Sequence, residues 1–137
     1  MVGKSPSKKR IYKPLPVIES REQVLEILSL GATEDLMRLP LALGLHCLES
    51  DKEFAQDICL QLANNDCYAV RANAVLGLAY IARNHNWLDK KLVKPYILRE
   101  LRENEEFNWR IIDAIEDINR FLGWRLAKKH MSRLKES

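Results

Sequence analysis

The chain is poor in the residues that interrupt helices or cross-link small folds. Its 137 residues include only five glycines, five prolines and three cysteines. This scarcity leaves room for long helices, and no useful stretch alternates between apolar and polar residues as a half-buried strand does. No apolar run approaches the ~18 residues that a membrane span needs. The sequence therefore predicts a helical domain and counts against a disulfide scaffold or a membrane-spanning protein.

The cysteines lack the spacing of a metal site or a disulfide framework. Cys47, Cys59 and Cys67 are odd in number and do not form the close ligand pairs that zinc needs. Gly44 and Gly77 are isolated within helical patterns, where we expect them to allow close helix approach rather than to cradle phosphate. We therefore expect no metal, no cofactor and no catalytic residue. Reduced cysteines in apolar stretches favour a cytoplasmic protein.

One alternative for chemistry stays open at this point. His85 falls at the predicted end of a helix, where an imidazole can bond the terminal carbonyl groups. A cysteine paired with a histidine could also act as a nucleophile, although nothing in the sequence orients such a pair. We favour the structural role for His85.

The charge is divided between the ends of the chain and its body. The formal net charge is +3, but residues 1–14 and 125–137 together carry +9, so residues 15–124 carry −6. No hydrophobic segment follows the basic N-terminus, so we expect no secretory signal. We predict a flexible basic tail at 1–16, a folded domain at 17–124, and a basic helix extension or tail at 125–137. The acidic body favours a basic protein partner and disfavours nucleic acid.

One phrase of the sequence occurs twice. Residues 38–45 read RLPLALGL, and 33 positions later residues 71–78 read RANAVLGL, with Arg, Leu, Gly and Leu at the same offsets. A third, weaker copy begins 39 positions further on, at Trp109-Arg110. A period of this length is typical of stacked helix pairs. Helices are predicted at 20–30, 34–49, 51–64, 68–85, 89–103 and from 106 past Trp124, which makes three pairs.

The turn of the middle pair resembles the HEAT-repeat signature. Asp66 stands in the turn, Val70-Arg71 follows, and Ala74 comes three residues later. The last pair repeats this loosely, with Glu105 or Glu106 in place of the aspartate and Trp109-Arg110 in place of Val-Arg. The resemblance implies a HEAT/armadillo-like α-α superhelix of about three pairs. It also implies that Asp66, Arg71 and Arg110 are structural, with the aspartate and arginine bonded to each other and to turn backbone.

Two helix faces are candidates for contact with a partner. On the predicted helix 68–85, Val70, Ala74, Leu78 and Ile81 form the apolar stripe, and the opposite side carries Asn73 and Tyr80. The last helix has a sharper division, because its polar side is acidic and edged by indoles. We predict that this second surface binds the partner; it comprises Glu105, Glu106, Trp109, Asp113, Glu116, Asp117, Arg120 and Trp124. Alternatively it is a solvated face, with Trp109 serving as core filler at the turn.

The predicted function is that of a non-enzymatic protein-binding module, either a monomer or a heterodimer with its partner. In size, single-domain form and acidic body the chain resembles the small bacterial HEAT-like immunity proteins that inhibit secreted nuclease toxins. That resemblance implies occlusion of a basic toxin by the acidic face of the last helix. Two alternatives are a HEAT-like nucleic-acid binder, which would need Arg83, Lys90, Lys91 and Lys94 on one face, and a repeat-type accessory or scaffold subunit.

Overall fold

The computed structural model describes residues 15–131, and this part of the chain is helical and contains no strand. The elements, in chain order, are α2 (Arg21–Leu30), α3 (Thr33–His46), the short 3₁₀ helix η2 (Glu49–Asp51), α4 (Lys52–Leu62), α5 (Tyr68–His85), α6 (Lys90–Glu103) and α7 (Asn108–Leu122). The all-α prediction is confirmed. Residues 1–14 of the predicted basic tail and residues 132–137 of the predicted extension lie outside the described residues.

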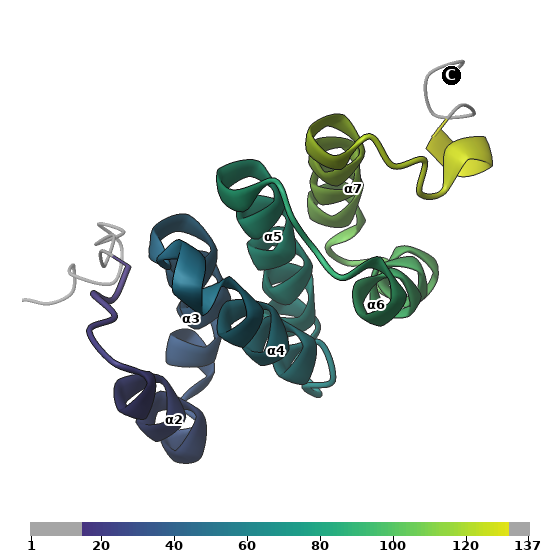
Figure 1. The fold of residues 1–137 in the computed structure, drawn as a ribbon. Helices are drawn as coiled ribbons and strands as arrows, with labels where there is room; N and C mark the ends of the chain where they lie inside the picture. Colours follow the sequence, from purple (N-terminus) through teal and green to yellow (C-terminus); the bar gives the residue numbers. More distant parts are fainter. Residues whose placement is uncertain (1–14, 132–137) are drawn as a thin grey trace, which may run out of the picture.

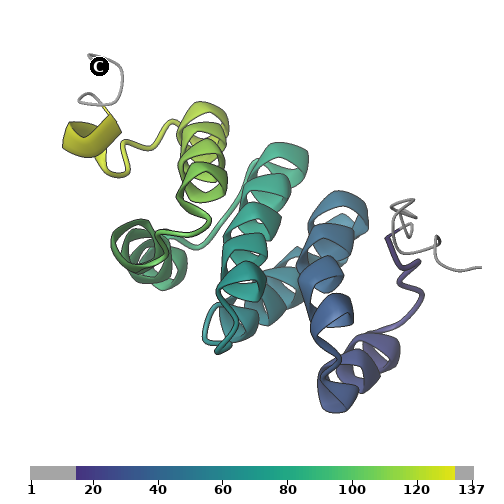
Figure 2. The same ribbon diagram turned by 180° about the vertical axis from the view of Figure 1, so that it is seen from behind.

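The helices form two layers (Figure 1). The second helix of each pair, α3, α5 and α7, stands in one row, and the three run in the same direction. The view from behind shows the same row, with α2, α4 and α6 on its other side (Figure 2). Within the row, α5 packs directly against both α3 and α7, whereas the first helices of the pairs make few contacts with one another. The row of second helices therefore holds the fold together.

The central helix, α5, is buried on almost every side. The predicted apolar stripe is buried, as shown by Ala74 and Leu78, which have no exposed surface. On the opposite side Asn73 is only 6% exposed and Gly77 lies against α3, whereas Tyr80 is half-buried. A helix enclosed by neighbours needs no polar face. The expectation that Asn73 is open to a partner is therefore wrong.

The two glycines of the repeated phrase lie where α3 and α5 cross. A methyl group placed on Gly44 would lie 2.6 Å from the carbonyl oxygen of Gly77 and 2.8 Å from Cβ of Tyr80. A methyl group on Gly77 would lie 2.6 Å from the carbonyl oxygen of Pro40 and 2.9 Å from Sγ of Cys59. These distances are too short for any side chain, so the prediction of close helix approach is confirmed.

Glycines in the left-handed conformation end the first and last helices. Gly31, at φ +67°, follows α2 where the sequence predicts a stop. Gly123, at φ +69°, ends α7 at Leu122, so the expected continuation of this helix past Trp124 is wrong. Beyond it the chain turns back onto α7, because the side chain of Asn119 accepts from the backbone N–H of Leu126 at 2.9 Å and donates to its carbonyl oxygen at 3.2 Å.

Candidate functional site

One face of α7 is acidic and exposed, and a tryptophan lies at its N-terminal end. Trp109 is 75% exposed, an unusual state for the largest apolar side chain. Asp113 and Glu116 are exposed at helical spacing from it, and Asp117 and Arg120 continue the same face. The buried side of α7 is made of isoleucines and alanine: Ile111, Ile112, Ala114, Ile115 and Ile118. The helix therefore presents its acidic side to solvent, as the sequence predicts.

The turn before α7 extends this surface. Glu105 and Glu106 are exposed between the end of α6 and the start of α7. The one cation of the face, Arg120, lies 3.8 Å from Asp117, and this pair is largely exposed. Exposed pairs of this kind contribute little to stability, so the acidic character of the face is hardly offset. We call the set Glu105, Glu106, Trp109, Asp113, Glu116, Asp117 and Arg120 the α7 surface.

Trp109 does not occupy the position that the weak third repeat predicts for it. In that alignment it stands for Val70, which is fully buried. The exposed state of Trp109 therefore shows that the two residues are not equivalent in the fold. Its alternative role as core filler is also wrong, because three quarters of its surface is open to solvent.

Asn73 joins three helices instead of facing a partner. Its side-chain amide donates to the carbonyl oxygen of Met37 on α3 at 2.8 Å, and its oxygen accepts from Arg110 on α7 at 2.6 Å. Both of its polar atoms are thus used inside the row of second helices. Asn73 is not part of the candidate surface, and Arg110 ties the last pair to the middle one.

Tyr80 and Trp124 also lie away from the α7 surface. Tyr80 is half-buried beside Gly44, and the Arg83 guanidinium carbon lies 5.1 Å from the centre of its ring. Trp124 is half-buried beyond the end of α7, and Lys90 Nζ lies 5.2 Å from its ring centre. The structure therefore groups Trp124 with the α5–α6 loop and not with Trp109.

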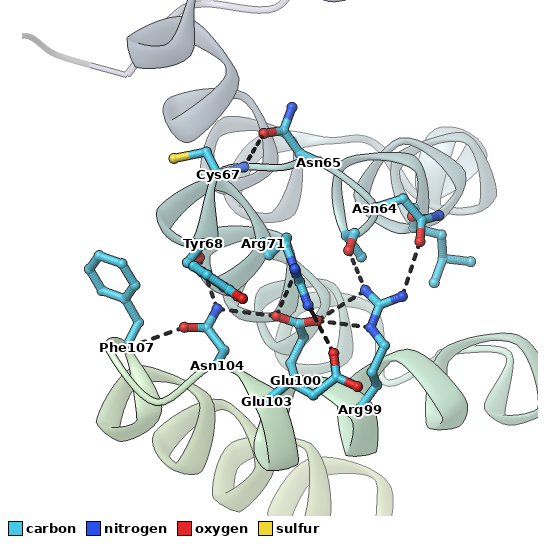
Figure 3. A network of polar contacts seen from close by, with 12 residues as sticks. Asn64, Asn65, Cys67, Tyr68, Arg71, Arg99, Glu100, Glu103, Asn104 and Phe107 are labelled. Atoms are coloured by element: carbon cyan, nitrogen blue, oxygen red, sulfur yellow. Dashed lines mark hydrogen bonds and ion pairs between the residues drawn. The ribbon is translucent and has the colours of Figure 1, made fainter.

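Arg71 is the centre of a buried polar network between α5 and α6 (Figure 3). Its guanidinium donates to the carboxylate of Glu100, with Nη2 at 2.7 Å from Oε2. These hydrogen bonds raise the pKa of Arg71 above its usual range. Asp66, the partner that the HEAT resemblance implies, is exposed, and no bond between it and Arg71 is present among the described residues. The expected Asp66–Arg71 pair is therefore replaced by Arg71–Glu100.

Glu100 has no exposed surface, and its carboxylate accepts hydrogen bonds from three side chains. Besides Arg71, it accepts from Arg99 Nε at 3.0 Å and from the amide of Asn104 at 3.1 Å. Asn104 also donates to the carbonyl oxygen of Tyr68 at 2.9 Å, across the pair boundary (Figure 3). The sequence carries a signal for this network, because Glu100 and Asn104 fall on the stripe that Val93 and Ile97 bury, where a carboxylate requires a partner.

Cys47 and His85 are in contact, as a cysteine–histidine nucleophile would require, but their geometry disfavours catalysis. His85 Nε2 lies 3.3 Å from Cys47 Sγ and 3.1 Å from the Cys47 carbonyl oxygen. A ring nitrogen that donates its proton to the carbonyl has no lone pair left to take a proton from the thiol. Burial raises the pKa of the Cys47 thiol, and the Asp51 charge raises it further. Both effects disfavour the reactive thiolate.

The described residues contain no group of three or more His, Cys, Asp or Glu side chains placed to hold a metal ion. None of the helices between residues 15 and 131 is both long and apolar enough to cross a bilayer. Comparisons of the chain with protein-family models, curated proteins and solved structures found no match. The inference of function therefore rests on the geometry of this chain.

Proposed function

We propose that this chain is a non-enzymatic binding module of the HEAT-like α-α superhelical type, and that the α7 surface binds a basic protein. The observation that carries the proposal is the exposure of Trp109 among carboxylates. Tryptophan is enriched among the residues that dominate binding energies, because it buries a large area with little loss of conformational freedom. An indole left in water on a folded helix is available for such a contact at no cost to the core.

The charge around Trp109 indicates the kind of partner. Glu105, Glu106, Asp113 and Glu116 are exposed around it. Clustered carboxylates accelerate association with a positively charged partner and disfavour acidic ones. The surface therefore fits a protein whose own binding face is rich in lysine and arginine.

The first half of the fold adds to the negative potential. Residues 15–66 contain ten acidic and three basic side chains. All three cations are already engaged, because Arg21 lies 2.8 Å from Asp51, Arg38 lies 2.9 Å from Asp35, and Lys52 lies 3.6 Å from Glu49. This excess of acid extends the attraction for a basic partner well beyond α7.

The two-layer stack supports the HEAT-like assignment. Helix pairs pack side by side, and Arg71, Asn73, Asn104 and Arg110 bond across the boundaries between pairs. Stacked helix pairs present extended surfaces and commonly hold other macromolecules. The specific form that we propose is an immunity protein, in which the α7 surface covers the substrate-binding face of a basic, nuclease-type toxin.

The first test is whether the gene immediately upstream of this chain's gene encodes a basic, nuclease-type protein. The second is whether this chain binds and inhibits that protein. Trp109→Ala is expected to weaken binding by about 30-fold, the effect of losing about 2 kcal/mol at a central contact. Asp113→Lys combined with Asp117→Lys is expected to slow association at low salt and to reduce the dependence of the rate on salt.

The matched control is Glu22→Lys combined with Glu26→Lys, which changes the net charge equally on exposed positions of α2. We expect the control to reduce affinity less than threefold, and far-ultraviolet circular dichroism should show all variants folded. Unchanged binding and unchanged salt dependence in the Asp113/Asp117 variant would refute the α7 surface as the contact. A wild-type chain that does not bind the upstream protein would refute the immunity function.

A second candidate function, nucleic-acid binding, is favoured by a different observation. The half-buried Trp124 lies under a lysine at the other end of α7, beside the exposed basic residues of α6.

A further inference from the structure

A small cleft opens where α5 and α7 end. The two helices run in the same direction, so their C-terminal ends lie on the same side of the fold. The loop after α5 and the segment after α7 are therefore close together (Figure 1). The cleft has a volume of about 250 Å³. It is lined by Asn86, Trp87, Leu88, Phe121, Leu122 and Trp124. Two of the three tryptophans of the chain and one phenylalanine therefore meet in one aromatic depression.

Each tryptophan of the cleft carries a lysine over its ring. Lys90 Nζ lies 5.2 Å from the ring centre of Trp124, and Lys52 Nζ lies at the same distance from that of Trp87. Lys52 also pairs with Glu49 at 3.6 Å. Lys90 has no ion pair with residues 15–131, so its charge is available to an anion at the rim.

Further exposed cations follow the cleft residues in the sequence, on α6 and after Trp124. Lys91 and Lys94 follow Lys90 on the exposed part of that helix. Arg125, Lys128 and Lys129 are exposed on the segment after Trp124. Asp89 is the acidic residue next to this group in the sequence. The segments that supply the cleft therefore carry mainly positive charge, in contrast to the α7 surface.

We propose that this cleft binds single-stranded nucleic acid. One unpaired base takes the place of the Lys90 ammonium over the ring of Trp124, and Lys90 then pairs with the flanking phosphate. An aromatic floor beside cations is the combination that single-strand binding uses, because every base has a face to stack and every nucleotide carries a charge. The lysines exclude a cationic ligand by repulsion. A duplex fits poorly because its bases are already stacked and paired.

The first test uses a fluorescein-labelled oligouridylate of about 12 nucleotides and the matching oligothymidylate, measured by fluorescence anisotropy at low salt. The wild type is expected to bind both strands and to show quenching of tryptophan fluorescence. Trp124→Ala is expected to weaken binding by about 5- to 100-fold, the effect of losing one stacked base. Trp109→Ala, which also removes one indole but on the acidic face, is expected to leave binding unchanged.

A second variant covers the case in which Trp124→Ala does not fold. Lys90 is exposed, so Lys90→Ala leaves the core intact. It is expected to weaken binding two- to fivefold and to lower the slope of log affinity against log salt by about 0.7, the effect of one phosphate contact on a single strand. Arg38→Ala removes a cation from the acidic half of the fold and is the matched control, with no expected change in either quantity.

Four outcomes would overturn the proposal. The first is that the wild type does not bind the single strand at low salt, and the second is that Trp109→Ala and Trp124→Ala weaken binding equally. The third is that duplex DNA binds as tightly as the single strand. The fourth is that an acidic peptide such as oligoglutamate displaces the labelled oligonucleotide as well as an unlabelled strand does. The last outcome would assign the cleft to an acidic protein. Because Trp109 takes no part in the cleft, failure of the α7 surface to bind a protein partner would not change the expected oligonucleotide binding.

Discussion

The contact between Gly44 and Gly77 supports a sharp prediction about stability. A methyl group on Gly77 would lie 2.6 Å from the Pro40 carbonyl oxygen, where ordinary contact begins at 3.4 Å. The obstacle is backbone, so it cannot rotate away, and α3 and α5 must separate. Overpacking of this kind costs up to about 3 kcal/mol. The gain in helix propensity from Gly to Ala offsets about 1 kcal/mol of it.

Gly77→Ala is therefore expected to lower the free energy of unfolding by about 2 kcal/mol. The measurement is urea unfolding followed by far-ultraviolet circular dichroism. Gly44→Ala should have a similar effect, because its methyl group would meet the Gly77 carbonyl oxygen at the same distance. The double variant should cost less than the sum, since one separation of the two helices relieves both clashes.

The sign of the change decides the matter. Replacing an unobstructed glycine inside a helix with alanine raises the free energy of unfolding by about 1 kcal/mol. If Gly77→Ala or Gly44→Ala makes the protein more stable, α3 and α5 do not cross at these glycines. Strict additivity of the two changes would likewise contradict a shared contact.

Two further predictions concern buried polar groups and thiols. Arg71→Ala leaves the fully buried Glu100 with fewer partners, and it should lower the free energy of unfolding by about 3 kcal/mol in the same urea assay. The control is Arg38→Ala, which removes a more exposed ion pair and should lower it by less than about 1 kcal/mol. Burial raises the pKa of the Cys59 thiol far above its ordinary value. As the pH rises, the thiol therefore loses its proton in the unfolded state before it does so in the folded state. The free energy of unfolding should fall above about pH 9 by up to about 1.4 kcal/mol per pH unit. Cys59→Ala should flatten this decline, and an equal slope in the variant would contradict the assignment to Cys59.

Much of the fold follows from the sequence because its main signals are local. Helical periodicity, the turn residues and Gly31 predict the order of the helices and the end of α2. The repeated phrase also points to the crossing of α3 and α5, because a glycine recurs at the same place in each copy. These features need no knowledge of what lies across the fold.

The errors arise where a residue's role depends on its neighbours in space. Asn73 lies on the polar side of a helical wheel, but α3 and α7 enclose that side and take up both of its polar atoms. The helical pattern predicts Trp124 on a continued helix, but Gly123 turns the chain, and the indole lies in the cleft instead. The Asp66–Arg71 pair fails because Glu100, 29 residues beyond Arg71, supplies a buried carboxylate instead.

The candidate surface was easier to predict than the buried contacts. Trp109, Asp113 and Glu116 repeat at helical spacing opposite the isoleucines of α7, so periodicity alone separates the two sides. The aromatic cleft could not be found in this way. Trp87 and Trp124 lie on different turns of the chain, and only the parallel course of α5 and α7 brings those turns together.

The uneven distribution of charge along the stack has a consequence for the molecule in solution. Residues 15–66 have seven more acidic than basic side chains, whereas residues 67–131 have four more basic than acidic ones. Residues 15–131 therefore carry an electric dipole, negative toward α2 and positive toward the C-terminal pair, and the five basic residues among residues 1–14 offset part of its negative charge. Such a distribution favours head-to-tail attraction between two copies in dilute buffer. Mobile ions screen that attraction over about 8 Å at physiological ionic strength and so weaken it.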